Sequence, residues 1–416
     1  MPDTLAPRIA APGRAAHRDP NVLRWVAAYT ASTLGDSIFF LALSWAAVQH
    51  GSPAEAGIVT AVSAVPRALL MLGGGVVVDR LGPRRVVIGS DAVRCAAVLV
   101  VAALLFATDP GLWLLAVLAL VFGAVDALFL PAVGALPARI TGKDQLARVQ
   151  GMRGLAIRFS SVVGAPLGGL GVAVGGAAAA FAGAGLLIAV SVPLLVSVRM
   201  RELPPDDVTA AGGGTAWRDL RDGLGYIRRH RVLGPLMLVI ALGDLGFVGP
   251  LNIGLTLLAD ERGWGAAGMG WVLAGFGVGA GTAALLLTVR GRVPHAGYVV
   301  AGALVPGAAA IGALAQAPTL PVAVGTALLI GLLAGLSGAL CGALLQTGAA
   351  PAYLGRVTAV GGIVSLGVAP LSMPLSAAAI GVWGTGPVFA VSAAVCGLGG
   401  VVALCAPGVR RAELPG

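Results

Sequence analysis

Apolar residues lie along the chain in long runs, and short polar segments separate these runs from one another. Each run has about 20 residues, the length that a helix needs to cross a hydrocarbon layer of roughly 30 Å. In lipid a single segment satisfies its own backbone hydrogen bonds only as a helix, so each run is predicted to be helical. The pattern therefore predicts an all-α polytopic membrane protein with twelve transmembrane helices, at 25–48, 57–78, 86–107, 111–135, 155–174, 176–198, 233–258, 267–289, 297–316, 320–346, 357–380 and 386–406.

The only long polar connection, residues 199–232, follows the sixth predicted span. It divides the chain into an N-terminal six-helix half, 1–198, and a C-terminal six-helix half, 233–416. The end of this connection reads "WRDLRDGLGYIRRH" and predicts a surface helix. The tripeptide Leu-Gly-Asp occurs at 34–36 and again at 242–244, in the first span of each half. This placement predicts two halves that are parallel repeats about the membrane normal.

Composition agrees with the pattern, since 57% of the 416 residues are hydrophobic and 11% are charged. The net charge of +9 does not indicate nucleic-acid binding, because the basic residues lie in short loops between spans. Loops after even-numbered spans carry nearly all of them, whereas loops after odd-numbered spans carry only Arg262. The positive-inside rule then predicts a multi-pass protein of the inner (plasma) membrane with both termini in the cytoplasm. The N-terminal segment lacks the pattern of a secretory signal, so the first span is expected to be retained.

The loop after the second span reads "GGGVVVDRLGPRRVV" and has the spacing G-x-x-x-D-R-x-G-x-R-R. Its glycines permit close helix packing and a tight turn, and its aspartate can meet a helix N-terminus of the other half. Its arginines suit the headgroup layer, and an ordinary positive-inside loop with turn glycines is the alternative interpretation. The residues of this signature loop are Gly75, Asp79, Arg80, Gly82, Arg84 and Arg85.

The signature loop resembles that of the major facilitator superfamily. Further stretches resemble its bacterial drug-efflux branch, which includes the enterobactin-exporter-like and macrolide-exporter-like proteins: "LGDSIFFLALSWAAVQHGSP", "FGAVDALFLPAVGALPARI", "AWRDLRDGLGYIRRH" and "LGRVTAVGGIVSLGVAPL". The resemblance covers essentially the whole chain. It implies the major facilitator fold, a loop that gates transport, and a protein expected to be a monomer.

Span five contains "VVGAPLGG", which resembles the Gly-Pro motif of facilitator exporters. Here Ala165 separates the glycine from the proline, a departure from the family pattern that bears on the direction of transport. A proline between glycines bends a helix and lets a neighbour approach. Ordinary small-residue packing and an export-specific role are equally supported for this bend motif, which comprises Gly164, Pro166, Gly168 and Gly169.

Charged residues inside the spans are costly, so each is expected to face a partner or a water-filled cavity. Asp36 and Arg67 lie at matching depths, as do Arg94 and Asp126, so each pair could form an ion pair. Asp36 is the candidate proton-coupling carboxylate, because an apolar surrounding favours its neutral form and a nearby arginine its charged form. Asp244 is the reserve candidate, and a packing ion pair is the alternative for both.

Other polar groups in the spans have different expected roles. A structural role is favoured over transport for the charge cluster of Asp91, Arg94 and Asp126, which could join the signature loop by a contact of Asp126 with Arg80. Asn252 and Gln346 are candidate cavity residues.

The sequence has no G-x-x-x-x-G-K-[ST] loop and no metal-ligand spacing of its four histidines, so we expect no cofactor beyond a proton gradient. We predict a proton-coupled secondary active exporter of amphipathic small molecules such as drugs, antibiotics or secondary metabolites. Its partners would be the substrate, protons and the lipid bilayer. A facilitator-type importer and a siderophore exporter are alternatives, and a membrane-embedded enzyme is a remote one.

Overall fold

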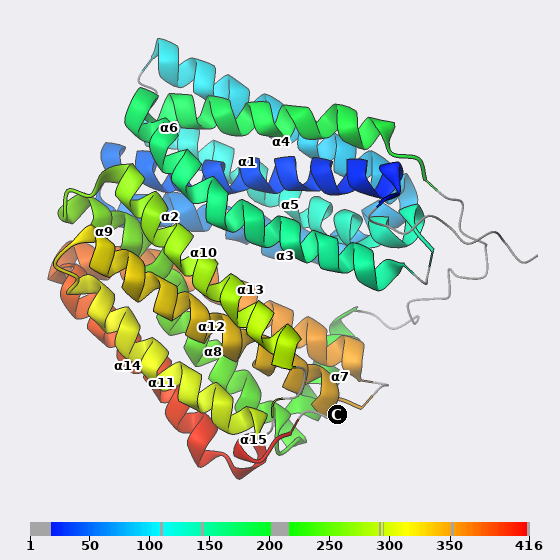
Figure 1. The fold of residues 1–416 in the computed structure, drawn as a ribbon, viewed down its shortest axis with the longest axis vertical. Coiled ribbons are helices and arrows are strands. Elements are labelled where there is room, and N and C mark those ends of the chain that lie inside the picture. The colour runs from blue at the N-terminus through cyan, green and yellow to red at the C-terminus, as the bar shows by residue number, and fades with distance from the viewer. Residues whose placement is uncertain are drawn as a thin grey trace, which may run out of the picture.

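The computed structural model describes residues 18–108, 111–142, 145–200, 216–290, 293, 295–350 and 353–413. All regular elements of these residues are helices (Figure 1). The helices of the first half are α1 (Pro20–His50), α2 (Pro53–Val62), α3 (Ala64–Leu81), α4 (Pro83–Ala107), α5 (Leu112–Ile140) and α6 (Leu146–Ser197). The later elements are α7 (Ala216–Arg229), α8 (Leu233–Gly249), the π-helical segment η3 (Pro250–Gly254), α9 (Leu255–Glu261), α10 (Gly265–Arg290), α11 (Ala296–Ala315), α12 (Leu320–Gly348), α13 (Leu354–Trp383), α14 (Thr385–Cys405) and α15 (Pro407–Arg410).

The helices form two bundles, α1 to α6 and α8 to α14, which lie one above the other in Figure 1. Among the described residues, ten helices are long and apolar enough to cross a membrane. The predicted all-helical membrane fold is confirmed, and α7 occupies the predicted surface helix. The count of twelve stays a prediction; α6 covers two predicted spans in two helical parts that meet at a kink, and α2 with α3 covers another.

Glycines mark the points where these long helices change direction. Within α6 the backbone leaves helical geometry at Gly175 and Gly176, between the predicted fifth and sixth spans. Gly82 has a φ of 82° between α3 and α4, and its N–H donates to the carbonyl of Val78. This left-handed conformation favours glycine, so the tight turn predicted at Gly82 is confirmed.

The seventh predicted span is interrupted at its centre. The Ser372 hydroxyl of α13 accepts from the Gly249 N–H at 2.9 Å and donates to the Leu245 carbonyl at 3.0 Å. These two backbone groups are partners in a regular α-helix, so a side chain from α13 is hydrogen-bonded to both groups of one turn of α8. The next residue, Pro250, has no N–H, and the π-helical segment η3 begins there. The span is thus a helix, a π-helical segment and a second helix.

Both ends of the described chain lie at the end of the molecule where the two halves are connected, called here the linker end. The Asn21 side chain of α1 donates to the carbonyl of Arg199, which follows α6, at 2.7 Å. The Gly297 N–H of α11 donates to the carbonyl of Ala412 at 3.3 Å. This agrees with the prediction that both termini share one side of the membrane, and which side that is stays a prediction.

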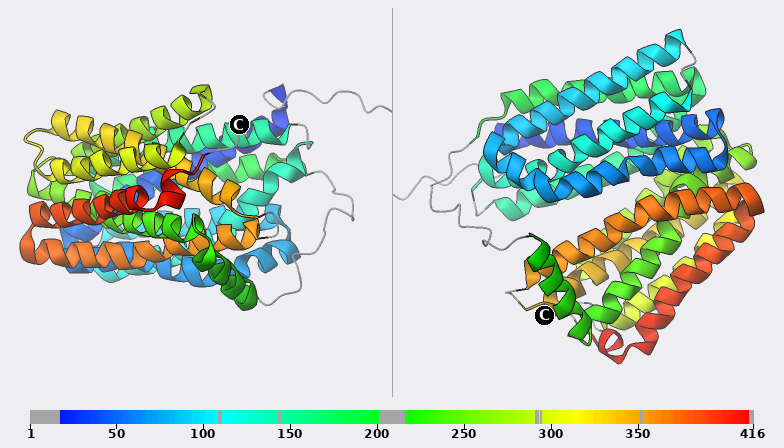
Figure 2. Two further views of the ribbon diagram at one scale, coloured as in Figure 1. Left: turned by 90° about the horizontal axis from the view of Figure 1, so that it is seen from below. Right: turned by 180° about the vertical axis from the view of Figure 1, so that it is seen from behind.

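The two halves make close contacts near the opposite end. The side chain of Gln49 donates to Asp260 at 2.8 Å, which joins the ends of α1 and α9. Gly57 of α2 lies against α13, and Gly169 of α6 lies against Ala266 at the start of α10. Towards the linker end the two bundles diverge, as the right-hand view of Figure 2 shows.

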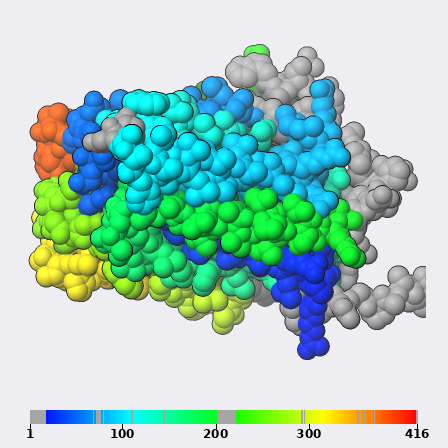
Figure 3. All heavy atoms as spheres, turned by 90° about the horizontal axis from the view of Figure 1, so that it is seen from above, coloured from blue at the N-terminus to red at the C-terminus, as the bar shows by residue number. Residues whose placement is uncertain are grey.

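The outer surface of the bundles is rich in large apolar side chains. In Figure 3, α4 and the second part of α6 lie side by side across the visible face of the first half. Phe106, Trp113 and Leu285 are each more than 60% exposed. Side chains of this kind on helices of membrane-spanning length are suited to contact with lipid.

Candidate functional site

Four charged side chains from three helices meet inside the first half. Arg94 of α4 is fully buried and donates Nη1 to both carboxylate oxygens of Asp36 of α1, at 3.0 and 2.8 Å. The same nitrogen donates to Asp126 of α5 at 3.3 Å, while Nη2 donates to Asp91 one turn earlier in α4. The predicted pairing of Arg94 with Asp126 is confirmed. One guanidinium therefore joins three carboxylates, and we call these four residues the Arg94 cluster.

Asp91 is the most enclosed member of the Arg94 cluster. Besides Arg94, it accepts hydrogen bonds from the hydroxyls of Ser32 at 3.1 Å and of Ser191. A buried carboxylate is stable only while its donors remain in place. The bonds from the two serines therefore hold Asp91 in position, and Asp91 in turn holds Arg94. Sequence reasoning missed both serines. Ser32 could have been predicted from the sequence, because it lies four residues before Asp36 and therefore on the same face of the helix.

Aromatic rings close another side of the cluster. The guanidinium carbon of Arg94 lies 4.0 Å from the ring centroid of Phe129 and 5.9 Å from that of Phe122. Phe122 in turn stacks on Phe39 with a centroid distance of 3.6 Å. The cation is thus held by a ring face and by carboxylates. Asp36 and Asp126 keep 19% and 13% side-chain exposure, so these two carboxylates are the members that reach solvent-accessible space.

The predicted ion pair between Asp36 and Arg67 is wrong. Asp36 pairs with Arg94, and among the described residues Arg67 forms no hydrogen bond or ion pair, although its charge acts on Asp126 over a longer distance. Both arginines lie at a suitable depth. Depth does not determine the rotation of a helix about its axis, and it is α4 that turns its arginine towards α1.

A cavity of about 530 Å³ lies mainly within the second half. Helices α8, α10, α11, α12, α13 and α14 supply nearly all of its lining, and Arg158 of α6 reaches it from the first half. Most of the lining is apolar, and Phe247 and Phe276 present rings whose centroids are 5.6 Å apart. A volume and lining of this kind are typical of small-molecule sites.

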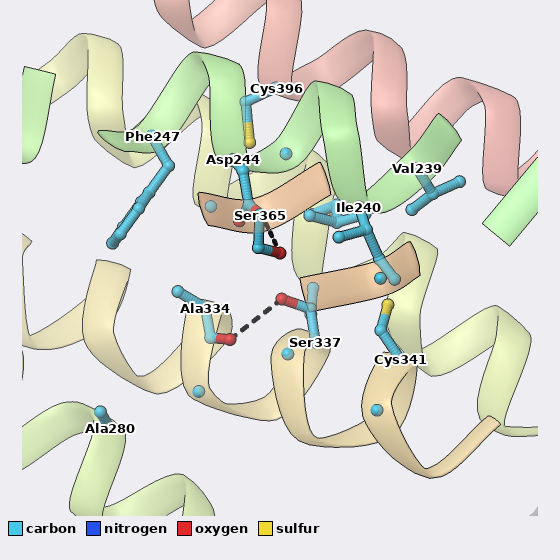
Figure 4. Close-up of a pocket in the computed structure, with 18 of the residues that line it drawn as sticks. Val239, Ile240, Asp244, Phe247, Ala280, Ala334, Ser337, Cys341, Ser365 and Cys396 are labelled. Atoms are coloured by element: carbon cyan, nitrogen blue, oxygen red, sulfur yellow. Dashed lines mark hydrogen bonds between the residues drawn. The ribbon is translucent and has the colours of Figure 1, made fainter. Parts of the chain in front are cut away.

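Asp244 is the acidic residue of this lining. Figure 4 shows it on α8, facing Ser365 of α13, whose hydroxyl donates to the carboxylate at 2.6 Å. The thiol of Cys396 lies next to Asp244, and Cys341 lines the cavity one helical turn after Ser337 on α12. No ion pair holds Asp244 in the part of the chain that the structure describes. The two aspartates of the Leu-Gly-Asp tripeptides therefore have different surroundings, since Asp36 lies next to an arginine and Asp244 next to a serine.

The two predicted cavity residues differ in position. Gln346 lines the cavity in the second half. Asn252 does not belong to the lining of that cavity, and its amide donates to the Val248 carbonyl at 2.7 Å. This bond satisfies a backbone group one turn earlier in the helix, and the predicted role of Asn252 as a cavity residue stays a prediction.

The bend motif of span five forms a helix crossing. Gly164 and Gly168 lie against Ser37 and Ile38 of α1, and Gly169 lies against α10 of the other half. The helix continues through Pro166. These contacts are those of small-residue packing, and an export-specific role of the motif stays a prediction.

The signature loop is described only in part. Gly75 lies within α3, but it and the side chain of Asp79 are outside the residues whose surroundings the structure describes. The predicted contact of Asp79 with a helix N-terminus of the other half is therefore untested. Arg80 and Arg85 are exposed, and Arg84 donates to the carbonyl of Val196 at 2.5 Å. The described partner of Asp126 is Arg94 and not Arg80, so the cluster lies apart from this loop.

The comparisons with known proteins agree with this architecture. A family model described as Major Facilitator Superfamily matches residues 25–370. The chain belongs to this superfamily. Over 427 residues the facilitator is 27% identical to the multidrug efflux pump Tap of Mycolicibacterium fortuitum, a match that covers 95% of this chain and 98% of the pump. The predicted family is confirmed, and its drug-efflux branch is supported by this relative.

Solved transporters share the fold of this facilitator. The D-xylose-proton symporter gives a TM-score of 0.70 at 14% identity and covers 94% of this chain and 99% of that one. The nucleoside transporter NupG gives a TM-score of 0.68 at 12% identity, with 92% and 98% covered. Identities this low show the fold alone. The protein is a multi-pass membrane transporter and not an enzyme, so the remote alternative of a membrane-embedded enzyme is wrong.

Proposed function

We propose that this facilitator is a proton-coupled exporter of amphipathic small molecules that works by alternating access in the plasma membrane. The observation that carries the proposal is the Arg94 cluster, where three carboxyl groups surround one guanidinium inside the membrane-spanning part of the first half. The efflux relative supports export rather than import.

The charges of the Arg94 cluster do not balance when every carboxyl group is ionised. Even when the more distant Arg67 is counted, three carboxylates face two cations. An unpaired charge inside a membrane-spanning bundle costs about 2.5–3.5 kcal/mol, the free energy of inserting one charged residue into a membrane. A bound proton removes the excess charge. The cluster therefore stores one proton when closed and releases it when water reaches it.

Asp36 is the member best placed to exchange that proton. Asp91 is enclosed by three donors, whereas Asp36 retains exposure, and among the described residues its hydrogen-bond partner is Arg94. Its helix, α1, packs along α6, which contacts α10 of the other half through Gly169. A rocking motion of the halves would change the side of the membrane from which water reaches the exposed part of Asp36, which couples its protonation to the transport cycle.

A test of coupling compares gradient-driven transport with exchange in the absence of a gradient. Everted membrane vesicles would be supplied with radiolabelled ethidium, with and without an imposed pH gradient, for wild type, Asp36→Asn and a surface control, Asp222→Asn. We expect Asp36→Asn to lose accumulation driven by the gradient and to retain ethidium exchange at equal pH. Asp222 is exposed on α7, so the control should behave as wild type.

Full gradient-driven accumulation in Asp36→Asn would refute the coupling role of this residue. Loss of gradient-driven accumulation in Asp244→Asn alone, with exchange retained, would move the role to the second half. Ethidium uptake into right-side-out vesicles that follows an inward proton gradient would favour the importer over the exporter.

A further inference from the structure

We infer that the second-half cavity is a binding site for amphipathic organic cations, with Asp244 as the counter-ion of the positive group. This inference rests on the proposed function only in taking the bound molecule to be the transported one. It assigns proton exchange and substrate recognition to different halves of the molecule.

The cavity has the size and surface that an amphipathic molecule requires. Its volume of about 530 Å³ falls within the range of small-molecule sites, roughly 300–1,000 Å³. The rings of Phe247 and Phe276 are tilted by 43° and lie 5.6 Å apart, so they offer a corner of aromatic surface. Aromatic faces attract both apolar groups and cations. The apolar lining and the two rings can therefore bind the apolar body of the ligand without any further polar contact.

Asp244 supplies the charge complement. Its carboxylate accepts one hydrogen bond, from the neutral hydroxyl of Ser365, although a carboxylate has about four acceptor positions. Within the described residues no cation is paired with it, in contrast to Asp36, whose carboxylate is occupied by Arg94. A carboxylate inside a membrane protein needs a positive partner or a proton. In this cavity the bound cation is that partner.

Arg158 gives the site a second electrostatic property. It is the cationic side chain of the described lining, it comes from α6 of the other half, and no described residue is bonded to it. Because it has the same sign as the ligand, it weakens cation binding whenever the halves bring it closer to Asp244. Removal of Arg158 and removal of Asp244 should thus change cation affinity in opposite directions, a result that loss of structure could not produce.

Two native cysteines report occupancy of the cavity. Cys341 and Cys396 line the cavity beside Asp244, whereas Cys405 is exposed at the end of α14 and lies outside the lining. A molecule that fills the cavity should slow the reaction of the first two thiols with N-ethylmaleimide and leave that of Cys405 unchanged. Mass spectrometry of each cysteine peptide measures all three rates in one sample.

The test uses tritiated tetraphenylphosphonium, a permanent cation, with neutral triphenylphosphine oxide as competitor, in a scintillation proximity assay on the purified full-length protein. We expect Asp244→Asn to weaken tetraphenylphosphonium binding by about tenfold or more, as for loss of a charged partner. The neutral competitor should bind this variant as it binds wild type. Arg158→Gln should bind the cation more tightly, and the surface control Asp222→Asn should bind it as wild type does.

Unchanged cation affinity in Asp244→Asn, or an equal loss for the cation and the neutral competitor, would overturn the inference. If that variant does not fold, the wild-type protein decides, since tetraphenylphosphonium that fails to protect Cys341 and Cys396 relative to Cys405 also overturns it. Binding in this assay needs no gradient. Failure of proton coupling with intact binding would therefore refute the proposed function alone, and failure of binding with intact coupling would refute this site alone.

Discussion

The hydroxyl of Ser372 offers a direct test of how the interrupted seventh span is held. It accepts from the Gly249 N–H at 2.9 Å and donates to the Leu245 carbonyl at 3.0 Å, and both Ser372 and Gly249 are buried. Ser372→Ala removes one oxygen atom and leaves hardly any cavity, so its effect isolates these two hydrogen bonds.

The expected size of the effect follows from the burial of these groups. A buried backbone group left without a partner costs about 1–3 kcal/mol, whereas a regular i to i+4 bond reformed between Leu245 and Gly249 would recover part of this. We expect Ser372→Ala to lower the free energy of unfolding by about 1–3 kcal/mol. A matched control is Ser161→Ala, because Ser161 is partly exposed and the described bond of its hydroxyl is to the Ile157 carbonyl of its own helix. Surface changes of that kind usually alter stability by less than about 0.5 kcal/mol.

Stability would be measured by unfolding in mixed micelles with increasing fractions of sodium dodecyl sulfate, followed by tryptophan fluorescence. Amide hydrogen exchange supplies a local readout, and we expect faster exchange at Gly249 in Ser372→Ala but not in Ser161→Ala. Equal unfolding free energies for the two variants, together with unchanged exchange at Gly249, would show that the hydroxyl does not hold the span.

Three further results are expected. Arg94→Gln should lower the free energy of unfolding by about 3–5 kcal/mol, because it leaves the fully buried Asp91 without a cation. The double variant with Asp91→Asn should recover part of this loss in the same micelle assay, and a double variant as unstable as Arg94→Gln would contradict the prediction. Gly57→Val should speed amide exchange in α2 and α13, because a side chain at position 57 meets α13 at the contact between the halves. The control Gly151→Val places its side chain in open space and should leave this exchange unchanged. Equal exchange rates in α2 and α13 for the two variants would refute the contact. Asp79→Asn should impair ethidium efflux at a normal level of membrane-inserted protein, as the signature loop predicts. Normal efflux by this variant would refute the predicted contact of Asp79 with a helix N-terminus of the other half.

Much of the architecture was predictable because the bilayer imposes a simple rule on sequence. Runs such as 320–346 had to be helices of membrane-spanning length, and the structure places α12 there. The turn at Gly82 and the surface helix at 217–230 were also predicted from local chemistry. Each of these features depends on residues that are neighbours in the sequence.

The candidate site was predicted less completely. The sequence singled out Asp36, Arg94 and Asp126, but it assigned Asp36 to Arg67 and treated the other two as a separate cluster. Ser372 was missed altogether, because a serine in an apolar run has no signal of its own. Its role comes from the crossing of α13 with α8, which brings its hydroxyl to two backbone groups more than 120 residues away in sequence.

The sequence by itself determined which segments are helices and where the long polar connection between the two bundles lies, because a membrane-spanning helix needs an apolar run of a set length. The tertiary structure alone decided which charges meet. That outcome depends on the rotation of each helix about its axis, which packing fixes through contacts such as those of Gly164 and Gly168 with α1. The aspartates of the two Leu-Gly-Asp tripeptides therefore differ, since α4 brings Arg94 to Asp36 while α13 brings Ser365 to Asp244.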